Sequence, residues 1–421
     1  MEKNKDLDIG FDLGNQYSQI SCFHPVTGVI ETIGGTTGEN YHFIPTTLGV
    51  TETKREWLFG EDACMMAEHE DGILIDNILE QIKRKESFVI YDSVFDGSVI
   101  LEKYFRKTLL LLQKYYGDNR IHKIVVTLEE MNLFLVEMIY KALEHMGIEK
   151  NRAFVQEHSQ SYLYYALNQK RELWSQDVAL FDYSKKGMMY YQIHINRKVR
   201  PMLIGLEKRE GTKEITYEML EHREYETLTE HFLGFAGKIL NKQSISTLYF
   251  VGEGFLSNWS DRVLQELCRG KRGFRGPNIY THGACYSARY MNTEEFKEKF
   301  TLLGEGILEK SISLCLYRDG KVQKTEVIST GTYWKEAESK ICLIFDEEDE
   351  LQLNIFDPMK KVETVRVITL EDMPKRGKRM ERFEVSFHFE DIRTCIVTIK
   401  DKGFGDYAPS TNRIWEKRLE I

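Results

Sequence analysis

The stretch from Leu7 to Phe23 constrains the fold of this chain more than any other. Apolar residues alternate with small or acidic ones from Leu7 to Leu13, which is the period of a β-strand. Gly14 then permits a backbone conformation that other residues avoid, and the apolar pattern resumes toward Phe23. The pattern predicts two strands joined by a tight turn that directs backbone N–H groups and the Asp12 carboxylate at one point. A phosphate with its metal ion would bind there, and an ordinary hairpin is the alternative interpretation.

The composition limits the class of protein. With 421 residues the chain is too long for one core, so we expect two or three domains. Hydrophobic residues make up 42% and charged residues 29%, which is typical of globular proteins. A net charge of −9 argues against a general nucleic-acid binder. We expect no membrane contact, since no stretch approaches the roughly 20 apolar residues that a membrane helix needs.

The seven cysteines are scattered singly along the chain, and none forms a CxxC pair. This spacing predicts neither a zinc site nor a disulfide framework, and it fits a reducing compartment. The N-terminus carries no apolar signal core. We therefore expect a cytoplasmic protein, whereas the sequence does not predict its oligomeric state.

The first part of the chain alternates between strand and helix patterns. Strands are predicted at 121–127, 153–156 and 177–183, separated by helices at about 131–146 and 159–168. This rhythm indicates an α/β sheet with right-handed crossovers. Further predictions are a small appended subdomain at 64–100, one long helix at 217–240, a basic loop at 270–276 and a short strand at 278–280.

The pattern changes near residue 296, where long helical periods give way to short alternating strands bounded by turn signals. Several short strands at this spacing predict a β-sandwich. We therefore expect a two-lobed α/β domain at 1–293, with lobe I at about 1–170 and lobe II at about 171–293. A linker at 294–307 and the sandwich at 308–421 complete the expected organisation.

Acidic residues and glycine turns recur at the predicted strand ends. The first hairpin holds Asp12, one strand ends at Glu157, another ends at Asp182, and a glycine turn covers 252–254. Nucleotide-phosphate sites usually lie at strand ends that face a crevice, so we expect these residues to surround one cleft. The alternatives are local: Glu157 would cap the following helix, and the glycines would serve a plain turn.

In this order of motifs the chain resembles the superfamily of actin, sugar-kinase and heat-shock-chaperone ATPases, and most of all chaperones of the DnaK type. Residues 9–18 (IGFDLGNQYS) resemble the first phosphate hairpin of the family, and 157–167 (EHSQSYLYYAL) resemble its connecting segment. The strands at 383–389 and 396–403 resemble the late strands of its peptide-binding sandwich. Less specific similarities occur at 44–46, 59–63, 250–254 and 283–284. A helical lid would follow in the chaperones, and we expect it to be absent here because the chain ends at Ile421.

The resemblance implies an actin-like ATPase fold followed by an all-β sandwich, with ATP or ADP and Mg²⁺ as cofactors. It implies catalytic roles for Asp12, Glu157 and Asp182, with Asp12 and Asp182 holding the metal through waters. The residues that it assigns to nucleotide binding are Gly14, Asn15, Gln16, Tyr17, Gly252, Glu253, Gly254 and Gly283.

Three departures from the family weaken the implied ATPase chemistry. The family has a run of glycines with a Thr after its second Asp, whereas Asp182 is followed by Tyr-Ser-Lys-Lys-Gly. A Lys of this turn would either touch a phosphate or lie in solvent. The region 188–247 is short for the subdomain that contacts adenine and ribose. The family's catalytic Lys has no clear counterpart, although Lys83, Arg84 and Lys85 lie in about the right region.

The sequence therefore predicts a degenerate, chaperone-like protein, which is either a weak ATPase or a pseudoenzyme. It would bind adenine nucleotide weakly or not at all, hydrolyse little of it, and bind a protein or peptide through the sandwich. One alternative is a small-molecule, sugar-type kinase of the same superfamily, for which no convincing base is visible. The other is a nucleotide-free scaffold in which Lys185 and Lys186 fill the phosphate cavity.

Overall fold

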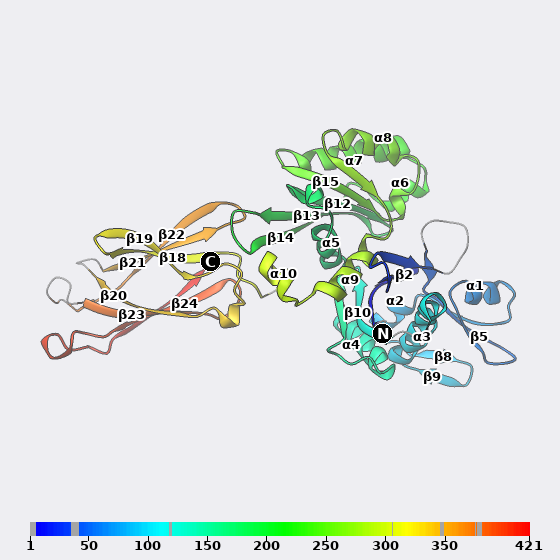
Figure 1. Cartoon of the computed structure of the whole chain (residues 1–421), viewed down its shortest axis with the longest axis horizontal. Coiled ribbons are helices and arrows are strands. Elements are labelled where there is room, and N and C mark those ends of the chain that lie inside the picture. The colour runs from blue at the N-terminus through cyan, green and yellow to red at the C-terminus, as the bar shows by residue number, and fades with distance from the viewer. Residues whose placement is uncertain are drawn as a thin grey trace. The chain divides into compact units, whose positions relative to one another are not determined.

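The computed structural model describes residues 6–34, 42–117, 120–304, 306–345, 349–374, 376 and 381–421. It is a mixed α/β structure with about 40% strand and 29% helix. The chain divides into two compact units (Figure 1). The first unit comprises residues 1–193 and 207–296, and the second comprises 194–206 and 297–421. The segment 194–206, which we expected in lobe II, thus belongs to the second unit.

The first unit contains two large sheets. The strands of the first sheet are β1 (Asp6–Leu13), β2 (Tyr17–Phe23), β3 (Ile30–Ile33), β4 (Ile44–Pro45), β10 (Arg120–Leu128) and β11 (Ala153–Glu157). Their order is β11-β10-β1-β2-β3, with β4 paired to β2. β1 pairs antiparallel with β2 and parallel with β10, so the hairpin predicted at the start of the chain occupies the centre of this sheet.

Both faces of the first sheet are covered by helices, namely α3 (Gly97–Tyr116), α4 (Leu133–His145) and α9 (Ile279–Tyr290). On one face Phe11 packs edge-on against Phe105 of α3, with ring centroids 5.0 Å apart. On the other face a Cβ added to Gly10 would lie 2.1 Å from the carbonyl oxygen of Thr281 in α9. Gly10 is therefore what allows α9 to approach β1 so closely.

The segment between β4 and α3 forms small antiparallel elements beside this core. They are β5 (Leu48–Thr51), β6 (Trp57–Phe59), α1 (Glu61–Glu68), β7 (Gly72–Ile75), α2 (Ile78–Lys83), β8 (Phe88–Ile90) and β9 (Ser93–Phe95). β5 lies between β6 and β7 in one sheet, and β8 and β9 form a hairpin. The appended part therefore starts before residue 64, where we expected it to begin.

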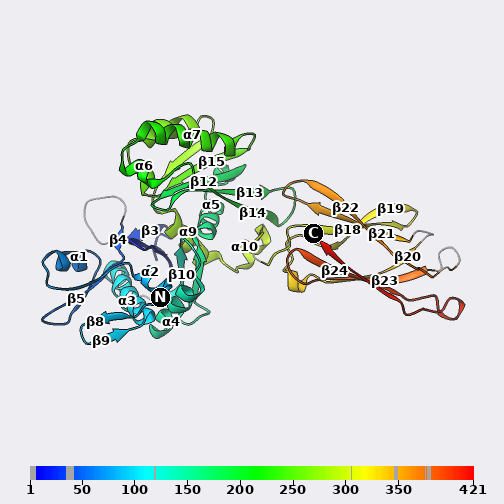
Figure 2. The ribbon, with the colours of Figure 1, turned by 180° about the vertical axis from the view of Figure 1, so that it is seen from behind.

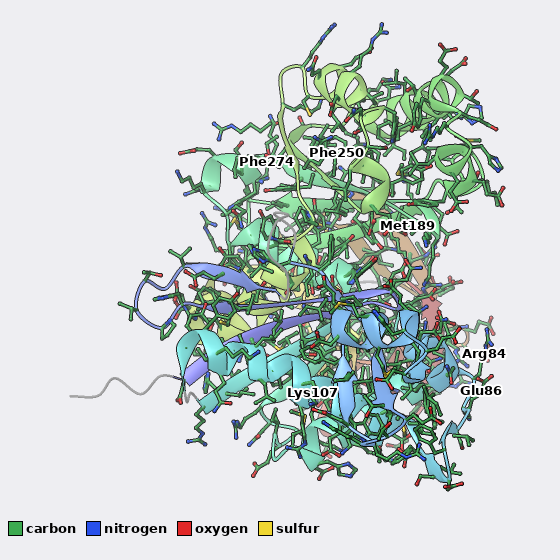
Figure 3. The ribbon with its side chains drawn as sticks, turned by 90° about the vertical axis from the view of Figure 1, so that its right-hand side faces the viewer. Arg84, Glu86, Lys107, Met189, Phe250 and Phe274 are labelled. Atoms are coloured by element: carbon green, nitrogen blue, oxygen red, sulfur yellow. The ribbon has the colours of Figure 1, made fainter. Side chains whose placement is uncertain are left out.

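The second sheet of this unit has the order β16-β15-β12-β13. The elements of this region are β12 (Asp177–Ser184), β13 (Gly187–Asn196), α6 (Tyr217–Glu221), α7 (Tyr225–Leu240), β15 (Ile245–Val251), α8 (Ser260–Leu267) and β16 (Arg272–Arg275). Aromatic rings fill the space between sheet and helices: Phe181 stacks on Phe250 at 5.7 Å and meets Phe232 of α7 edge-on at 5.2 Å. Figure 3 shows Phe250 beside Phe274, which lies on the neighbouring edge strand β16.

Three elements predicted in this region are wrong. The helix expected at 217–240 is two helices, because Arg223 adopts a φ of +58° that interrupts the helical backbone. The basic segment 270–276 contains the strand β16, whose backbone pairs in parallel with β15. The strand expected at 278–280 is instead the start of α9, which begins at Ile279.

Helix α5 (His158–Leu167) packs against α9, and both lie between the two sheets in Figures 1 and 2. A Cβ added to Gly283 would lie 1.9 Å from the backbone oxygen of Ser161, so only glycine fits at this crossing. A buried chain of hydrogen bonds fixes α5 further, since Ser161 donates to Thr127 at 2.7 Å and accepts from Gln156 at 2.7 Å. These contacts position the first turn of α5.

The second unit contains two four-stranded sheets that share one hydrophobic core. One has the order β19-β18-β21-β22 and the other β20-β23-β24-β25. Their strands are β18 (Ser311–Arg318), β19 (Lys321–Ile328), β20 (Ser339–Phe345), β21 (Glu350–Asp357), β22 (Val362–Thr369), β23 (Glu381–Phe389), β24 (Thr394–Asp401) and β25 (Ile414–Glu420). Neighbouring strands in these two sheets pair antiparallel.

Two further strands of the second unit come from distant parts of the chain. Residues 202–204 of β14 (Met202–Glu210) pair in parallel with β17 (Phe300–Leu302). The helix α10 (Glu294–Lys299) precedes β17 in the chain. Throughout the described ranges, the helices lack the combination of length and apolar character that a bilayer crossing requires.

Candidate functional site

A cavity of about 790 Å³ opens at the strand ends of the first unit. The β1–β2 hairpin supplies Asp12 and the turn that follows it, β12 supplies Asp182, and the end of β15 supplies the next glycine turn. The residues expected at the site that line this cavity are Asp12, Gly14, Asn15, Gln16, Tyr17, Asp182, Gly252 and Glu253. Residues from distant positions in the sequence thus converge on one cavity.

The two aspartates of the cavity are joined through His158 and Tyr280. Nε2 of His158 donates to Oδ1 of Asp12 at 2.7 Å. The His158 ring stacks on Tyr280, with centroids 3.9 Å apart and 13° between the planes. The Tyr280 hydroxyl in turn donates to Oδ2 of Asp182 at 2.5 Å. We call these four residues the Asp–His–Tyr–Asp chain.

Local structure explains why these four side chains meet. His158 is the first residue of α5, and Tyr280 lies in the first turn of α9, so both rings project from helix starts. Gln19 of β2 donates to Asn278, the residue before α9, at 2.9 Å. The first hairpin and the start of α9 are therefore tied together, which holds Tyr280 beside His158.

Burial changes the pKa values of the side chains in the Asp–His–Tyr–Asp chain. Burial alone would lower the pKa of His158, but the Asp12 carboxylate outweighs it and raises the pKa above its ordinary value. Burial raises the pKa of Asp182 to about 6, although the hydrogen bond from Tyr280 opposes this shift. The pKa of Tyr280 is raised by burial and by the nearby Asp182. Asp12, which accepts the hydrogen bond from Nε2, thus favours the protonated form of His158.

The lysines of the cavity also have partners. Nζ of Lys186, in the turn between β12 and β13, lies 2.9 Å from Glu129 and 3.6 Å from Glu130. Burial would lower the pKa of Lys186, yet the Glu129 and Glu130 carboxylates raise it. Nζ of Lys83 lies 2.8 Å from Glu80 on α2. The turn after Asp182 is thus ion-paired to the segment that follows β10.

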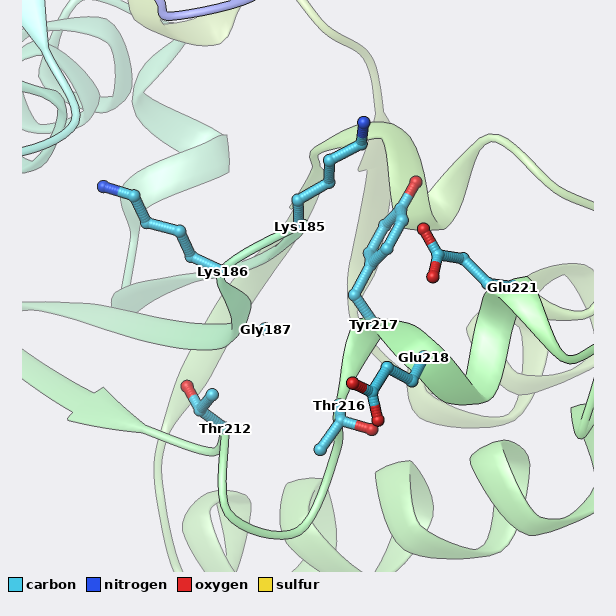
Figure 4. Close-up of a pocket in the computed structure, with 8 residues that line it drawn as sticks. All are labelled: Lys185, Lys186, Gly187, Thr212, Thr216, Tyr217, Glu218 and Glu221. Carbon is cyan, nitrogen blue, oxygen red and sulfur yellow. The ribbon is translucent and has the colours of Figure 1, made fainter. Parts of the chain in front are cut away.

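Lys185 and Lys186 point in different directions (Figure 4), and both also line a second, smaller hollow of about 370 Å³. This hollow is also lined by Tyr217 and Glu221 of α6. Gly187 has a φ of +102°, and a Cβ there would lie 2.5 Å from the Thr212 side chain, so the turn needs glycine at this position.

Three expected site residues do not line the cavity. Glu157 is the N-cap residue of α5, and its carboxylate accepts a hydrogen bond from the Ser159 hydroxyl at 3.2 Å. A Cβ on Gly254 would lie 2.2 Å from the Tyr183 ring, so this glycine serves packing. Gly283 serves the crossing of α5 and α9. Gly252, by contrast, lines the cavity, and a side chain there would collide with the site, because a Cβ would lie 2.7 Å from Asp182.

The basic residues considered for the catalytic lysine differ in position. Lys83 lines the cavity and is ion-paired with Glu80, which lines it as well. Arg84 is exposed and lies 3.9 Å from Glu86, at the periphery of the unit (Figure 3). Lys85 lies over the Phe134 ring. In the described part of the chain, no group of three or more His, Cys, Asp or Glu side chains is arranged to hold a metal ion.

Sequence reasoning missed His158, Tyr280, Glu129 and Glu130. Three of them could have been found by position, because His158 follows the strand end at Glu157 and the two glutamates follow the strand predicted at 121–127. Strand ends are where sites of this kind gather. Tyr280 carried no such signal, since it was placed in a strand.

Comparison with known families adds a classification. Residues 30–305 match a family described as a family of unknown function, DUF5716, C-terminal. The chain belongs to this family. The DUF5716 C-terminal region contains His158, Asp182 and Tyr280, whereas Asp12 lies before it. Residues 307–421 match DUF8552, a domain of unknown function. No curated protein matches the chain.

Proposed function

We propose that this protein is a non-hydrolysing, chaperone-like member of the actin, sugar-kinase and heat-shock-chaperone superfamily. Its first unit would bind a small ligand in the 790 Å³ cavity, with adenine compounds as the candidates. Its second unit would bind a protein or peptide. The ligand would act by favouring one conformation of the first unit over another, which requires different affinities for the two.

The proposed absence of hydrolysis rests on one observation, the Asp–His–Tyr–Asp chain. Phosphoryl transfer needs carboxylates that are free to hold a metal ion or orient a water molecule, and donors directed at the γ-phosphate. Here Asp12 accepts from His158 and Asp182 accepts from Tyr280. Both carboxylates that the resemblance assigns to Mg²⁺ are already hydrogen-bonded within the protein.

The donor set of the cavity does not fit Mg²⁺–ATP either. The side chains after Asp182 replace the open glycine backbone through which a phosphate would approach, and Lys186 is paired with Glu129. The proposed function therefore includes no step at a metal ion or a triphosphate.

The surface of the second unit supports the proposed binding of a protein or peptide. Tyr317 and Val322 face each other across β18 and β19 and are 73% and 71% exposed. Val365 and Val367 on the edge strand β22 are about half exposed. An extended peptide binds such a sheet by backbone hydrogen bonds and alternate side-chain contacts.

The scaffold alternative is favoured by one specific observation, which is the pairing of Lys186 with Glu129 and Glu130. A scaffold would keep this cavity free of any small ligand. Thermal unfolding separates the two functions, because a ligand at a hundred times its Kd adds about 2.7 kcal/mol to stability.

The test of the proposed function combines phosphate release with thermal unfolding of the full chain. With millimolar Mg²⁺–ATP we expect phosphate release at the level of the buffer and of the Asp12→Asn variant. Turnover within the range of kinases, about 1–100 s⁻¹, that Asp12→Asn abolishes would contradict the proposal. No thermal shift with ATP, ADP or adenosine would favour the scaffold.

A further inference from the structure

We infer that the cavity of the first unit selects an organic ligand that is uncharged or cationic and carries no phosphate group. The inference rests on the proposed function, since it names the class of ligand that this cavity would bind. It follows from the charges, the hydrogen-bonding groups and the apolar part of the lining, which are independent of one another.

Acidic groups outnumber basic groups in the cavity before any ligand arrives. Six carboxylates line it, on Asp12, Glu80, Glu129, Glu130, Asp182 and Glu253. The basic groups opposite them are His158 and three lysines, of which Lys83 and Lys186 have carboxylate partners within 3 Å. A phosphate would have to break one of these pairs and would then lie among the remaining carboxylates. An uncharged or cationic ligand meets no such repulsion.

Lys185 offers little compensation for an anion. Lys185 lines the cavity, but its amine points to the side of the Tyr217 hydroxyl in Figure 4, away from Lys186. Burial raises the pKa of Glu253, and Lys185 opposes this rise, so the Lys185 charge acts on a carboxylate of the same region. Both lysines of the turn that would replace the phosphate loop therefore already act on carboxylates of the lining, Lys185 on Glu253 and Lys186 on Glu129.

Two buried polar atoms at the cavity remain without a partner among the described residues. His158 is only 9% exposed, and its Nδ1 has no hydrogen-bond partner while its Nε2 is held by Asp12. Asn15 donates to Asn77 at 3.3 Å, which leaves its Oδ1 unpaired. A buried polar atom without a partner is costly, so a ligand that supplies one is favoured. Nδ1 of His158 and Oδ1 of Asn15 both call for hydrogen-bond partners, which an uncharged heterocycle or amide with its own donors and acceptors provides together.

Part of the lining is apolar. Leu79, Leu128, Leu135, Val251, Leu256 and Pro277 face the cavity. A volume of about 790 Å³ accommodates a drug-sized molecule, and such sites combine apolar walls with a few polar contacts. These features fit a ligand with a flat apolar ring system, of about the size of a base joined to a sugar.

The experiment compares adenosine with ATP as probes, each titrated against the full chain by calorimetry, with Mg²⁺ and with a chelator. We expect adenosine to bind at least about tenfold more tightly than ATP, a factor that corresponds to about 1.4 kcal/mol. The double variant Glu129→Gln/Glu130→Gln frees Lys186, so the ATP affinity should rise severalfold while the adenosine affinity stays the same. The control is Glu137→Gln, which breaks an ion pair with Lys141 on α4 and should change neither affinity.

The outcomes separate the inference from the function on which it rests. If ATP binds as tightly as adenosine or more tightly, the inference is overturned and the ligand-binding function stands. If the double variant does not improve ATP binding, the charge argument is wrong. If neither probe binds to any of the three proteins, both the ligand-binding function and the inference fail.

Discussion

Asp12 and Asp182 are the residues on which the sequence placed most of the chemistry, and each already has a donor inside the protein. His158 donates to Asp12, and Tyr280 donates to Asp182. A hydrogen bond to a carboxylate is roughly twice as strong as one between neutral groups, so a competing metal ion must displace a strong contact. At the scale of single residues, both carboxylates of the site are therefore already engaged by donors of the protein itself.

The first prediction concerns the buried hydroxyl of Tyr162, which has no hydrogen-bond partner among the described residues. Because Tyr162→Phe removes an unsatisfied polar group from the core, we expect the free energy of unfolding to stay equal or rise by about 1 kcal/mol. Urea unfolding measures the change. The matched control is Tyr190→Phe, which loses a 2.7 Å hydrogen bond to Gln192 and should cost about 1–2 kcal/mol. A destabilisation by Tyr162→Phe as large as that of the control would contradict the assignment.

The second prediction concerns the pH dependence of stability. Burial raises the pKa of Asp182 to about 6 from an ordinary value of 3.8. Between these values the native state holds a proton that the unfolded chain has lost, so stability from this group declines as the pH rises. We expect the unfolding free energy of the wild type, relative to Asp182→Asn, to fall by about 1–3 kcal/mol from pH 4 to pH 7.

The control for this titration is Asp96, the N-cap residue of α3. Hydrogen bonds from Ser98 lower the pKa of Asp96, so its contribution to stability has the opposite sign and is lost as the pH falls. Urea unfolding of wild type, Asp182→Asn and Asp96→Asn across this pH range gives both slopes. Equal slopes for the two variants would show that the burial of Asp182 has no such effect.

At the scale of elements, the crossing of α5 and α9 positions His158 and Tyr280. A Cβ on Gly283 would collide with backbone, which cannot move without separating the two helices. We expect Gly283→Ala to destabilise the first unit by more than about 2 kcal/mol. Gly234 of α7 is the control, since nothing lies within 4 Å of its Cβ position, and Gly234→Ala should add about 1 kcal/mol through helix propensity. A neutral Gly283→Ala would show that the crossing tolerates a side chain.

Elements with strong periodic patterns were predictable, and short ones were not. The strands at the centre of the first sheet followed from the alternation of Leu7 to Leu13 and from the apolar run at 121–127. The break after α6 was missed because Arg223 has no special tendency for a positive φ. The strand β16 was read as a charged loop because its side chains are exposed and only its backbone pairing makes it a strand.

At the scale of the whole molecule, the two units have separate cores and separate polar contacts. In the second unit Asp401 is fully buried and accepts two hydrogen bonds from Arg376, at 2.8 and 2.6 Å. Thr411 donates to the same carboxylate through its backbone and its hydroxyl, each at 2.7 Å. Removing the charge of Asp401 leaves Arg376 without its carboxylate partner.

The fourth prediction follows from this separation. We expect Asp401→Asn to cost about 3–5 kcal/mol, because it breaks a buried ion pair. Hydrogen exchange should accelerate in β23 and β24, with no change in β1 and β10 of the first unit. Asp372→Asn is the control, because it removes an exposed partner of Arg413 and should have little effect. Faster exchange in both units would contradict their independence.

The site could be predicted only in part, because its hydrogen-bonded pairs join residues that lie far apart in the sequence. Asp12 and His158 are 146 positions apart in the sequence, and Tyr280 and Asp182 are 98 apart. The sequence marks each strand end as a candidate for the site, yet it does not state which side chain will lie against which. The cavity was therefore foreseeable from motif order, whereas the pairing that occupies its carboxylates required the structure.

The pairing of Asp12 with His158 is the contact on which the account depends, and nitrogen NMR of the full chain labelled at histidine tests it most directly. We predict that the pKa of His158 lies above the ordinary value of 6.5, that Asp12→Asn lowers it, and that millimolar Mg²⁺ leaves it unchanged. A His158 resonance that ignores Asp12→Asn, or that Mg²⁺ shifts in the wild type, would contradict the account.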